Sequence, residues 1–122
     1  MRVYIPVTRS DVERRVEEGF WSISARRAWA VNQQLALALP EEDEEGREYI
    51  ASLTAAHESP SGLALAADVA TAMLGDEGAD GSVQVSGVLR DHDVACLLQV
   101  DAADDDSLLW FAPTEAAALL GQ

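Results

Sequence analysis

Alternation of apolar and polar residues predicts several strands along the chain. Residues 2–7 and 82–86 carry an apolar side chain at every second position, as a half-buried strand does. Residues 94–100 are apolar at nearly every position, which is typical of a central strand covered on both sides. Residues 28–31 predict one more short strand, and residues 108–111 begin the last hydrophobic element.

Helix signals lie between these segments. Ser10 and Glu13 have the spacing of a capping box, which predicts a helix over about residues 11–18 that ends at Gly19. A second helix is predicted over about residues 42–57. Its first turn would be acidic, and the positive end of the helix dipole stabilises negative side chains there. Four residues three or four apart form its expected buried stripe: Tyr49, Ile50, Leu53 and His57. Residues 116–120 predict a short closing helix, after a first turn begun by Pro113.

Two segments fit either a helix or a strand, and two others are predicted to be connections. Residues 32–39 are predicted as a short helix capped by Asn32, although their leucines also alternate as in a strand. Residues 63–69 fit either a buried strand or a helix that runs on to Leu74. The glycine-rich, acidic residues 75–81 predict a loop, and residues 101–106 predict a solvated connection.

These elements together predict the fold class. They indicate an α+β fold, a single small domain over residues 1–122, with elements in the order βα, β, αα, ββ, β, βα. A chain of 122 residues has a common size for one domain with one core. We expect a mixed, mainly antiparallel sheet of about four to six strands with three to four helices.

The net charge of the chain limits the classes of molecule that it is expected to bind. The chain has 22 Asp and Glu residues against 8 Arg and no Lys, a net charge of −14. Seven of the arginines lie at or before Arg47, so the remainder of the chain is almost purely acidic. Such a surface repels nucleic acid and anionic membranes. It favours a basic protein partner, or self-association between the arginine-richer and the acidic parts of two copies.

Candidate chemistry is sparse. Asp91, His92 and Asp93 place a histidine between two carboxylates, which makes them a speculative metal site or base–orienter pair. Cys96 lies in an apolar run and is expected to be a small core residue, which favours a reducing, cytoplasmic setting. No serine elbow, phosphate loop or dinucleotide motif occurs, so we expect no cofactor. No apolar run reaches the length of a membrane span.

Three segments in order resemble a known family. Residues 1–8, residues 65–69 and residues 108–115 are similar to segments of a family of small uncharacterised actinobacterial proteins, classed as a domain of unknown function. The last of these, with Trp-Phe-Ala-Pro-Thr-Glu, is the most specific, and the chain is shorter than typical members around residues 75–81. The resemblance implies that residues 63–69 form a strand. It implies no activity and no catalytic residues.

The leading functional hypothesis is a non-enzymatic cytoplasmic binding or interaction module whose acidic face is built from residues 41–48 and 101–106. Its candidate partner-binding residues are Glu41, Glu42, Glu44, Glu45, Asp104, Asp105 and Asp106. One alternative is a small metal-assisted or acid–base enzyme around residues 91–93. Another is an acidic DNA mimic, with carboxylates spaced like phosphates, that binds a basic protein.

Overall fold

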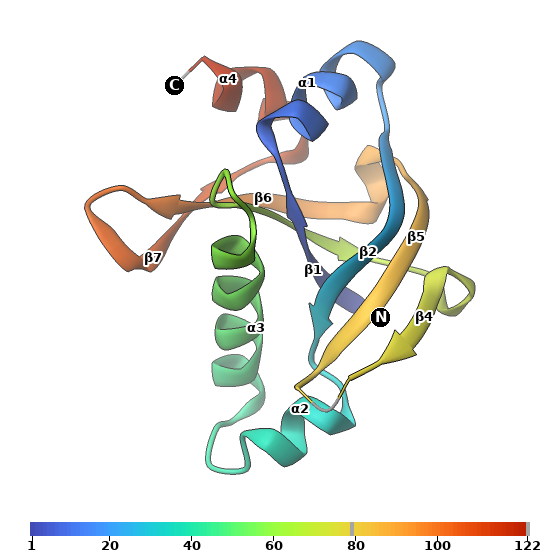
Figure 1. The fold of residues 1–122 in the computed structure, drawn as a ribbon. Coiled ribbons are helices and arrows are strands. Elements are labelled where there is room, and N and C mark those ends of the chain that lie inside the picture. Colours follow the sequence, from blue (N-terminus) through green and yellow to red (C-terminus); the bar gives the residue numbers. More distant parts are fainter. Residues whose placement is uncertain (79, 122) are drawn as a thin grey trace.

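One antiparallel sheet organises the protein. The computed structural model describes residues 1–78 and 80–121, and within them it has seven strands and four α-helices (Figure 1). The strands are β1 (Arg2–Val7), β2 (Trp21–Ala30), β3 (Leu63–Asp68), β4 (Leu74–Glu77), β5 (Ser82–Leu89), β6 (Val94–Asp101) and β7 (Asp104–Phe111). The helices are α1 (Arg9–Glu18), α2 (Gln33–Ala38), α3 (Glu44–Glu58) and α4 (Ala116–Leu120), with 3-10 turns η1 (Thr71–Met73), η2 (Asp91–Asp93) and η3 (Pro113–Glu115). No α-helix in this part is long and apolar enough to cross a membrane.

The sheet order is β4-β5-β2-β1-β3-β6-β7, and each of these neighbouring pairs is antiparallel. The α+β class is therefore confirmed. The expectation of a mainly antiparallel sheet is confirmed, but the sheet is antiparallel rather than mixed, and it has seven strands instead of four to six, because the acidic segment predicted as a loop forms the edge strand β4. Part of the predicted loop 75–81 pairs with β5 as β4, and residues 104–106 begin β7. Ala79, also in that predicted loop, lies outside the described residues.

The two faces of the sheet carry separate cores. On β1 the residues Val3, Ile5 and Val7 face one core, which α1 and α4 cover. Tyr4 faces the other core, where α3 packs across β1, β3 and β6. The period-two pattern of the sequence produces this division, because alternate side chains of a strand point to opposite faces. In Figure 1, α1 and α4 lie near each other at the top, and α3 lies lower, beneath β6 and β7 and to the left of β2 and β5.

The first helix begins two residues earlier than predicted. Thr8, not Ser10, is the N-cap: its Oγ1 accepts from Asp11 N at 3.1 Å, and Asp11 Oδ2 accepts from Thr8 N at 2.8 Å. The threonine–aspartate pair has the same capping-box spacing as Ser10 and Glu13, and its carboxylate gains further donors from β2. Gly19 ends α1 in the left-handed conformation at φ 83°, as predicted.

The ambiguous segments resolve as the capping and the resemblance indicated. Asn32 Oδ1 accepts from Leu35 N at 2.9 Å and caps α2. Residues 63–68 form β3, whose alanines Ala64 and Ala66 face α3.

The predicted buried stripe of α3 is wrong for two of its four residues, while Ile50 and Leu53 are partly buried. Tyr49 is 47% exposed and His57 is also exposed. Small side chains face the sheet instead: Ala51, Ser52, Ala55 and Ala56. They meet the alanine-rich strand β3, so helix and sheet approach closely. Large residues favoured by the apolar pattern do not fit in that space.

A bulge in β2 decides where its arginines point. The strand is ten residues long, far longer than the predicted 28–31, and its register with β5 shifts between Ile23 and Arg26. Ala25 sits at the bulge with φ 43°, and its N–H donates to Ser86 Oγ at 2.8 Å. One extra residue reverses the alternation. Arg26 therefore reaches the α1 face of the sheet, while Arg27 reaches the α3 face.

Candidate functional site

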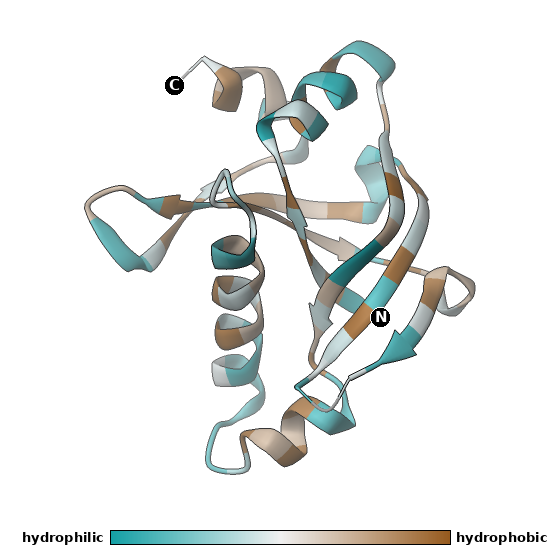
Figure 2. Ribbon diagram, in the orientation of Figure 1, coloured by the Kyte–Doolittle hydropathy of each residue, from teal (hydrophilic) through white to brown (hydrophobic). Residues whose placement is uncertain are grey.

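The first acidic segment, residues 41–45, is exposed at every position, where α2 leads into α3. Asp43 is the N-cap of α3, since its Oδ1 accepts from Gly46 N at 2.7 Å. Glu44 and Glu45 form the first turn, where the positive end of the helix dipole stabilises them. Figure 2 shows hydrophilic residues gathered along this connection. Helix capping explains one of these five carboxylates directly, and it leaves Glu41, Glu42, Glu44 and Glu45 free to meet a partner.

The second acidic segment, residues 104–106, lies at the other end of α3. His57 Nε2, in the last turn of α3, is 2.7 Å from the Asp105 carbonyl oxygen. Asp104 accepts from Asp106 N and Ser107 Oγ, and these hydrogen bonds lower the pKa of Asp104. The 15 residues of α3 span about 22 Å, so the two acidic segments do not form one continuous face.

Six of the eight arginines are engaged by partners other than the carboxylates of the two acidic segments. Within residues 1–78 and 80–121, four of them form ion pairs with other aspartates: Arg2 with Asp68, Arg15 with Asp91, Arg26 with Asp11 and Arg27 with Asp80. Two more donate to backbone carbonyls: Arg9 to Leu120 and Arg47 to Leu39. In the same part of the chain, none of the seven predicted partner-binding carboxylates has an ion-pair partner.

Asp91, His92 and Asp93 form the turn η2 between β5 and β6. Arg15 Nη2 lies 2.6 Å from both oxygens of Asp91, which ties η2 to α1. Asp93 Oδ2 accepts from Arg90 N at 3.0 Å, and its Oδ1 lies 3.4 Å from His92 Nε2. The described ranges hold no group of three His, Cys, Asp or Glu side chains placed to hold a metal ion. The metal or acid–base role of residues 91–93 stays a prediction, and the structure gives Asp91 a structural ion pair.

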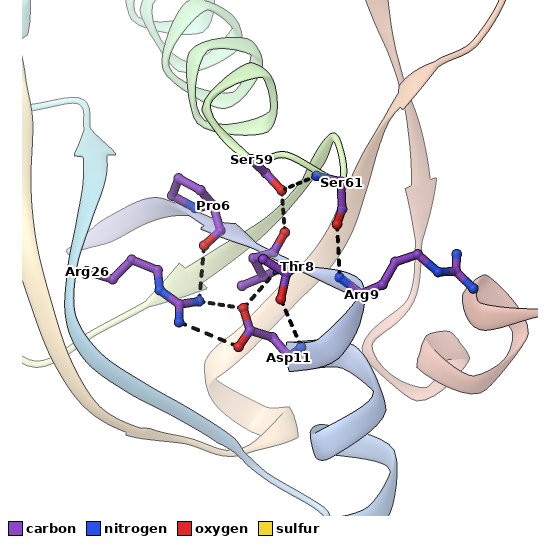
Figure 3. Close-up of polar contacts among 8 residues, drawn as sticks. Pro6, Thr8, Arg9, Asp11, Arg26, Ser59 and Ser61 are labelled. Atoms are coloured by element: carbon purple, nitrogen blue, oxygen red, sulfur yellow. Dashed lines mark hydrogen bonds and ion pairs between the residues drawn. The ribbon is translucent and has the colours of Figure 1, made fainter.

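A largely buried polar cluster joins the end of β1 to three other segments (Figure 3). Asp11 is 9% exposed and accepts from Arg26 Nη1 at 2.7 Å, and the same Nη1 donates to the Pro6 carbonyl at 3.2 Å. Burial by itself raises the pKa of Asp11. The Thr8 N–H and the Arg26 guanidinium outweigh burial and hold that pKa below its ordinary value.

The serine hydroxyls of this cluster form hydrogen bonds that hold loops in place. Ser59 Oγ donates to the Val7 carbonyl at 2.5 Å, and Ser61 Oγ accepts from Arg9 N at 3.1 Å. A nucleophilic serine instead needs a base within hydrogen-bond reach to accept its proton. The cluster therefore positions α1 and the loop after α3 against β1.

Cys96 is buried as the sequence predicted, at 8% exposure. Burial raises the pKa of its thiol, so the reactive thiolate is suppressed.

An open cleft of about 280 Å³, which no sequence pattern predicted, lies between α2, α3 and β2. We call it the α2–α3 cleft. Apolar residues line most of it: Trp29, Leu35, Ala38, Leu39, Ile50 and Ala51. Thr54 and three charged residues complete the lining: Arg27, Glu58 and Asp80. Four separate stretches of chain supply these residues, so no local motif marks the cleft.

Arg27 is fixed at the edge of the α2–α3 cleft. Its guanidinium carbon lies 4.8 Å from the centre of the Trp29 ring, and its Nη2 is 2.6 Å from Asp80 Oδ2. The Ser82 hydroxyl, the largest cause, and Arg27 among others hold the pKa of Asp80 below its ordinary value. Asp80 is therefore ionised at neutral pH and pairs with the Arg27 guanidinium.

The fold and the surface define the protein as a small α+β protein with a seven-stranded antiparallel sheet, exposed acidic segments and a small apolar cleft. The chain belongs to a family of unknown function (DUF6912), whose model matches residues 1–98. No curated protein and no solved structure matches the chain. The match includes the first acidic segment, residues 91–93 and the α2–α3 cleft. The second acidic segment and the C-terminal residues 108–115 lie outside it.

Proposed function

We propose that this protein is a non-enzymatic interaction module of the cytoplasm that binds a basic protein partner through its first acidic segment. One observation carries the proposal: Glu41, Glu42, Glu44 and Glu45 are exposed and have no ion-pair partner within the described ranges, although the chain has eight arginines. Concentrated, uncompensated charge speeds association with an oppositely charged surface.

The position of the segment strengthens this inference. Like charges in five successive residues repel one another, and the dipole of α3 offsets that cost for the residues of its first turn. A cationic partner would remove the repulsion. Lysine or arginine side chains bound here would be charge-assisted donors to carboxylates that already point into water.

The second acidic segment distinguishes a long contact with the partner from a short one. A partner that follows α3 for about 22 Å reaches Asp105 and Asp106, and a shorter one does not. Replacing Asp105 and Asp106 with asparagine leaves the local hydrogen bonds of Asp104 intact. This variant therefore separates a long contact from a short one.

The experiment is affinity capture from a lysate of the source cells at moderate salt. The test variant carries Glu41→Gln, Glu42→Gln, Glu44→Gln and Glu45→Gln. A matched control removes the same four charges from other exposed positions: Glu13→Gln, Glu17→Gln, Glu18→Gln and Glu77→Gln. We expect a basic protein to be retained by the wild type and the control but not by the test variant. If both variants lost the basic protein equally, its retention would depend only on the net charge of the chain, and this result would contradict the proposed site.

A further inference from the structure

The α2–α3 cleft has the size and lining of a receptor for one large side chain. Trp29 and Leu35 are each 4% exposed and form a rigid apolar base, while Leu39 and Ile50 are partly exposed at its sides. Its volume of about 280 Å³ lies just below the roughly 300–1,000 Å³ of typical small-molecule sites. A nucleotide-sized cofactor does not fit such a space, whereas an apolar side chain does.

The charges at the mouth favour a cationic neighbour for that side chain. Arg27 is neutralised by Asp80 at 2.6 Å, so the pair adds no net charge. Glu58 also lines the cleft, is exposed, and forms no ion pair within residues 1–78 and 80–121. The first acidic segment begins two residues after Leu39, a lining residue, and connects the two helices that form the walls.

We propose that the α2–α3 cleft receives a large aliphatic or aromatic side chain from a basic segment of a partner protein. Lysine or arginine residues that flank this side chain bind Glu58 and the first acidic segment. The inference rests on the proposed function and adds the anchor that gives it specificity. Charge alone attracts every cation, whereas a buried apolar anchor selects one sequence.

The matched variants differ only in where a phenyl ring is added. Ala38 lines the cleft and is exposed, so Ala38→Phe fills the cleft without disturbing the core. Ala118 is an exposed alanine of α4, which covers the opposite face of the sheet, so Ala118→Phe adds the same ring elsewhere. Dispersed amide resonances confirm that each variant is folded.

The probes are three short peptides with blocked ends: Arg-Arg-Leu-Arg-Arg, Arg-Arg-Gly-Arg-Arg and Glu-Glu-Leu-Glu-Glu. Titrations are followed by NMR of the isotope-labelled protein, through the indole N–H of Trp29 and the methyl groups of Ile50. Burying a leucine side chain strengthens binding by about tenfold or more. We expect the first peptide to bind that much more tightly than the second, and to shift the Trp29 and Ile50 signals. The Ala38→Phe variant is expected to lose this preference, and the Ala118→Phe variant to keep it.

The outcomes separate the two proposals. Equal binding of both arginine peptides, with shifts confined to residues 41–45, would overturn the anchor and leave the proposed function standing. Absence of binding by either arginine peptide would contradict both proposals. Tightest binding of the glutamate peptide would overturn the charge argument. Cleft signals that shift with protein concentration alone would make a second copy of this chain the occupant, which also overturns the proposal. If Ala38→Phe did not fold, the comparison of peptides on the wild type would still decide.

Discussion

Replacing Asp11 with alanine tests whether the buried polar cluster holds β1, α1 and β2 together. The carboxylate caps α1 at Thr8 and pairs with Arg26, which in turn bonds the Pro6 carbonyl (Figure 3). Alanine removes both interactions at once. It also leaves the Thr8 N–H and the Arg26 guanidinium without their acceptor.

The expected loss of stability depends on how deeply the Asp11–Arg26 ion pair is buried. Loss of a helix cap costs about 1 kcal/mol, and breaking a buried ion pair costs about 3–5 kcal/mol. The Arg26 side chain is 28% exposed, so water partly replaces its lost partner. We therefore expect Asp11→Ala to lower the free energy of unfolding by about 2–3 kcal/mol. For a chain of this size, that loss lowers the melting temperature by roughly 8–12 °C.

The assay is urea unfolding at pH 7, followed by tryptophan fluorescence, with Asp68→Ala as the control. Asp68 also pairs with one arginine, Arg2, at 2.8 Å, but their side chains are 61% and 40% exposed. Exposed pairs of this kind contribute about 0–1 kcal/mol. A loss in Asp11→Ala no greater than in Asp68→Ala would refute the claim that burial makes the cluster important.

The pH dependence gives an independent check on the same residue. The pKa of folded Asp11 lies below its ordinary value of about 3.9, so the unfolded state binds protons more readily. The stability that Asp11 contributes is complete above about pH 5 and is lost as pH falls through the folded-state pKa. The difference between wild type and Asp11→Ala is therefore expected to shrink below pH 5. A difference that stayed constant down to pH 3 would contradict this linkage.

Three further predictions concern other parts of the fold. Leu97 is 0% exposed, so Leu97→Ala is expected to cost about 2–5 kcal/mol in urea unfolding, and a cost below 1 kcal/mol would contradict its place in the core. Cys96 is buried and its thiol pKa is raised, so a thiol reagent is expected to label the native protein far more slowly than the urea-unfolded one; equal rates would refute this. Trp110 is 62% exposed while Trp21 and Trp29 are at most 4% exposed, so Trp110→Phe is expected to remove most of the fluorescence that iodide quenches. Unchanged quenching would place another tryptophan at the surface.

Local patterns predicted the elements whose signals are local. The alternation in residues 2–7 and 82–86 predicted β1 and β5, and Asn32 predicted the start of α2. A cap or a period-two pattern depends on neighbours within a few residues, so it can be recognised without the fold. Two residue pairs with capping-box spacing overlap at the start of α1, and the structure uses Thr8 and Asp11, whose carboxylate also accepts from Arg26 of β2.

The acidic parts of the two edge strands escaped prediction for a related reason. Residues 75–77 of β4 and 104–106 of β7 have the composition of loops, and at the edge of a sheet their side chains remain exposed. What makes them strands is backbone pairing with β5 and β6, which their composition does not encode.

The sequence by itself determined the charge of the surface, the alternation that divides the two cores, and most of the helix ends, because each depends on composition or on near neighbours. Only the tertiary structure decided which side chains share a site. Adjacent residues of a strand point to opposite faces, and the bulge at Ala25 decides that Arg26 enters the polar cluster while Arg27 reaches the α2–α3 cleft. That cleft joins β2, α2 and α3 through contacts between distant positions, which depend on sheet register and helix packing that local sequence does not contain.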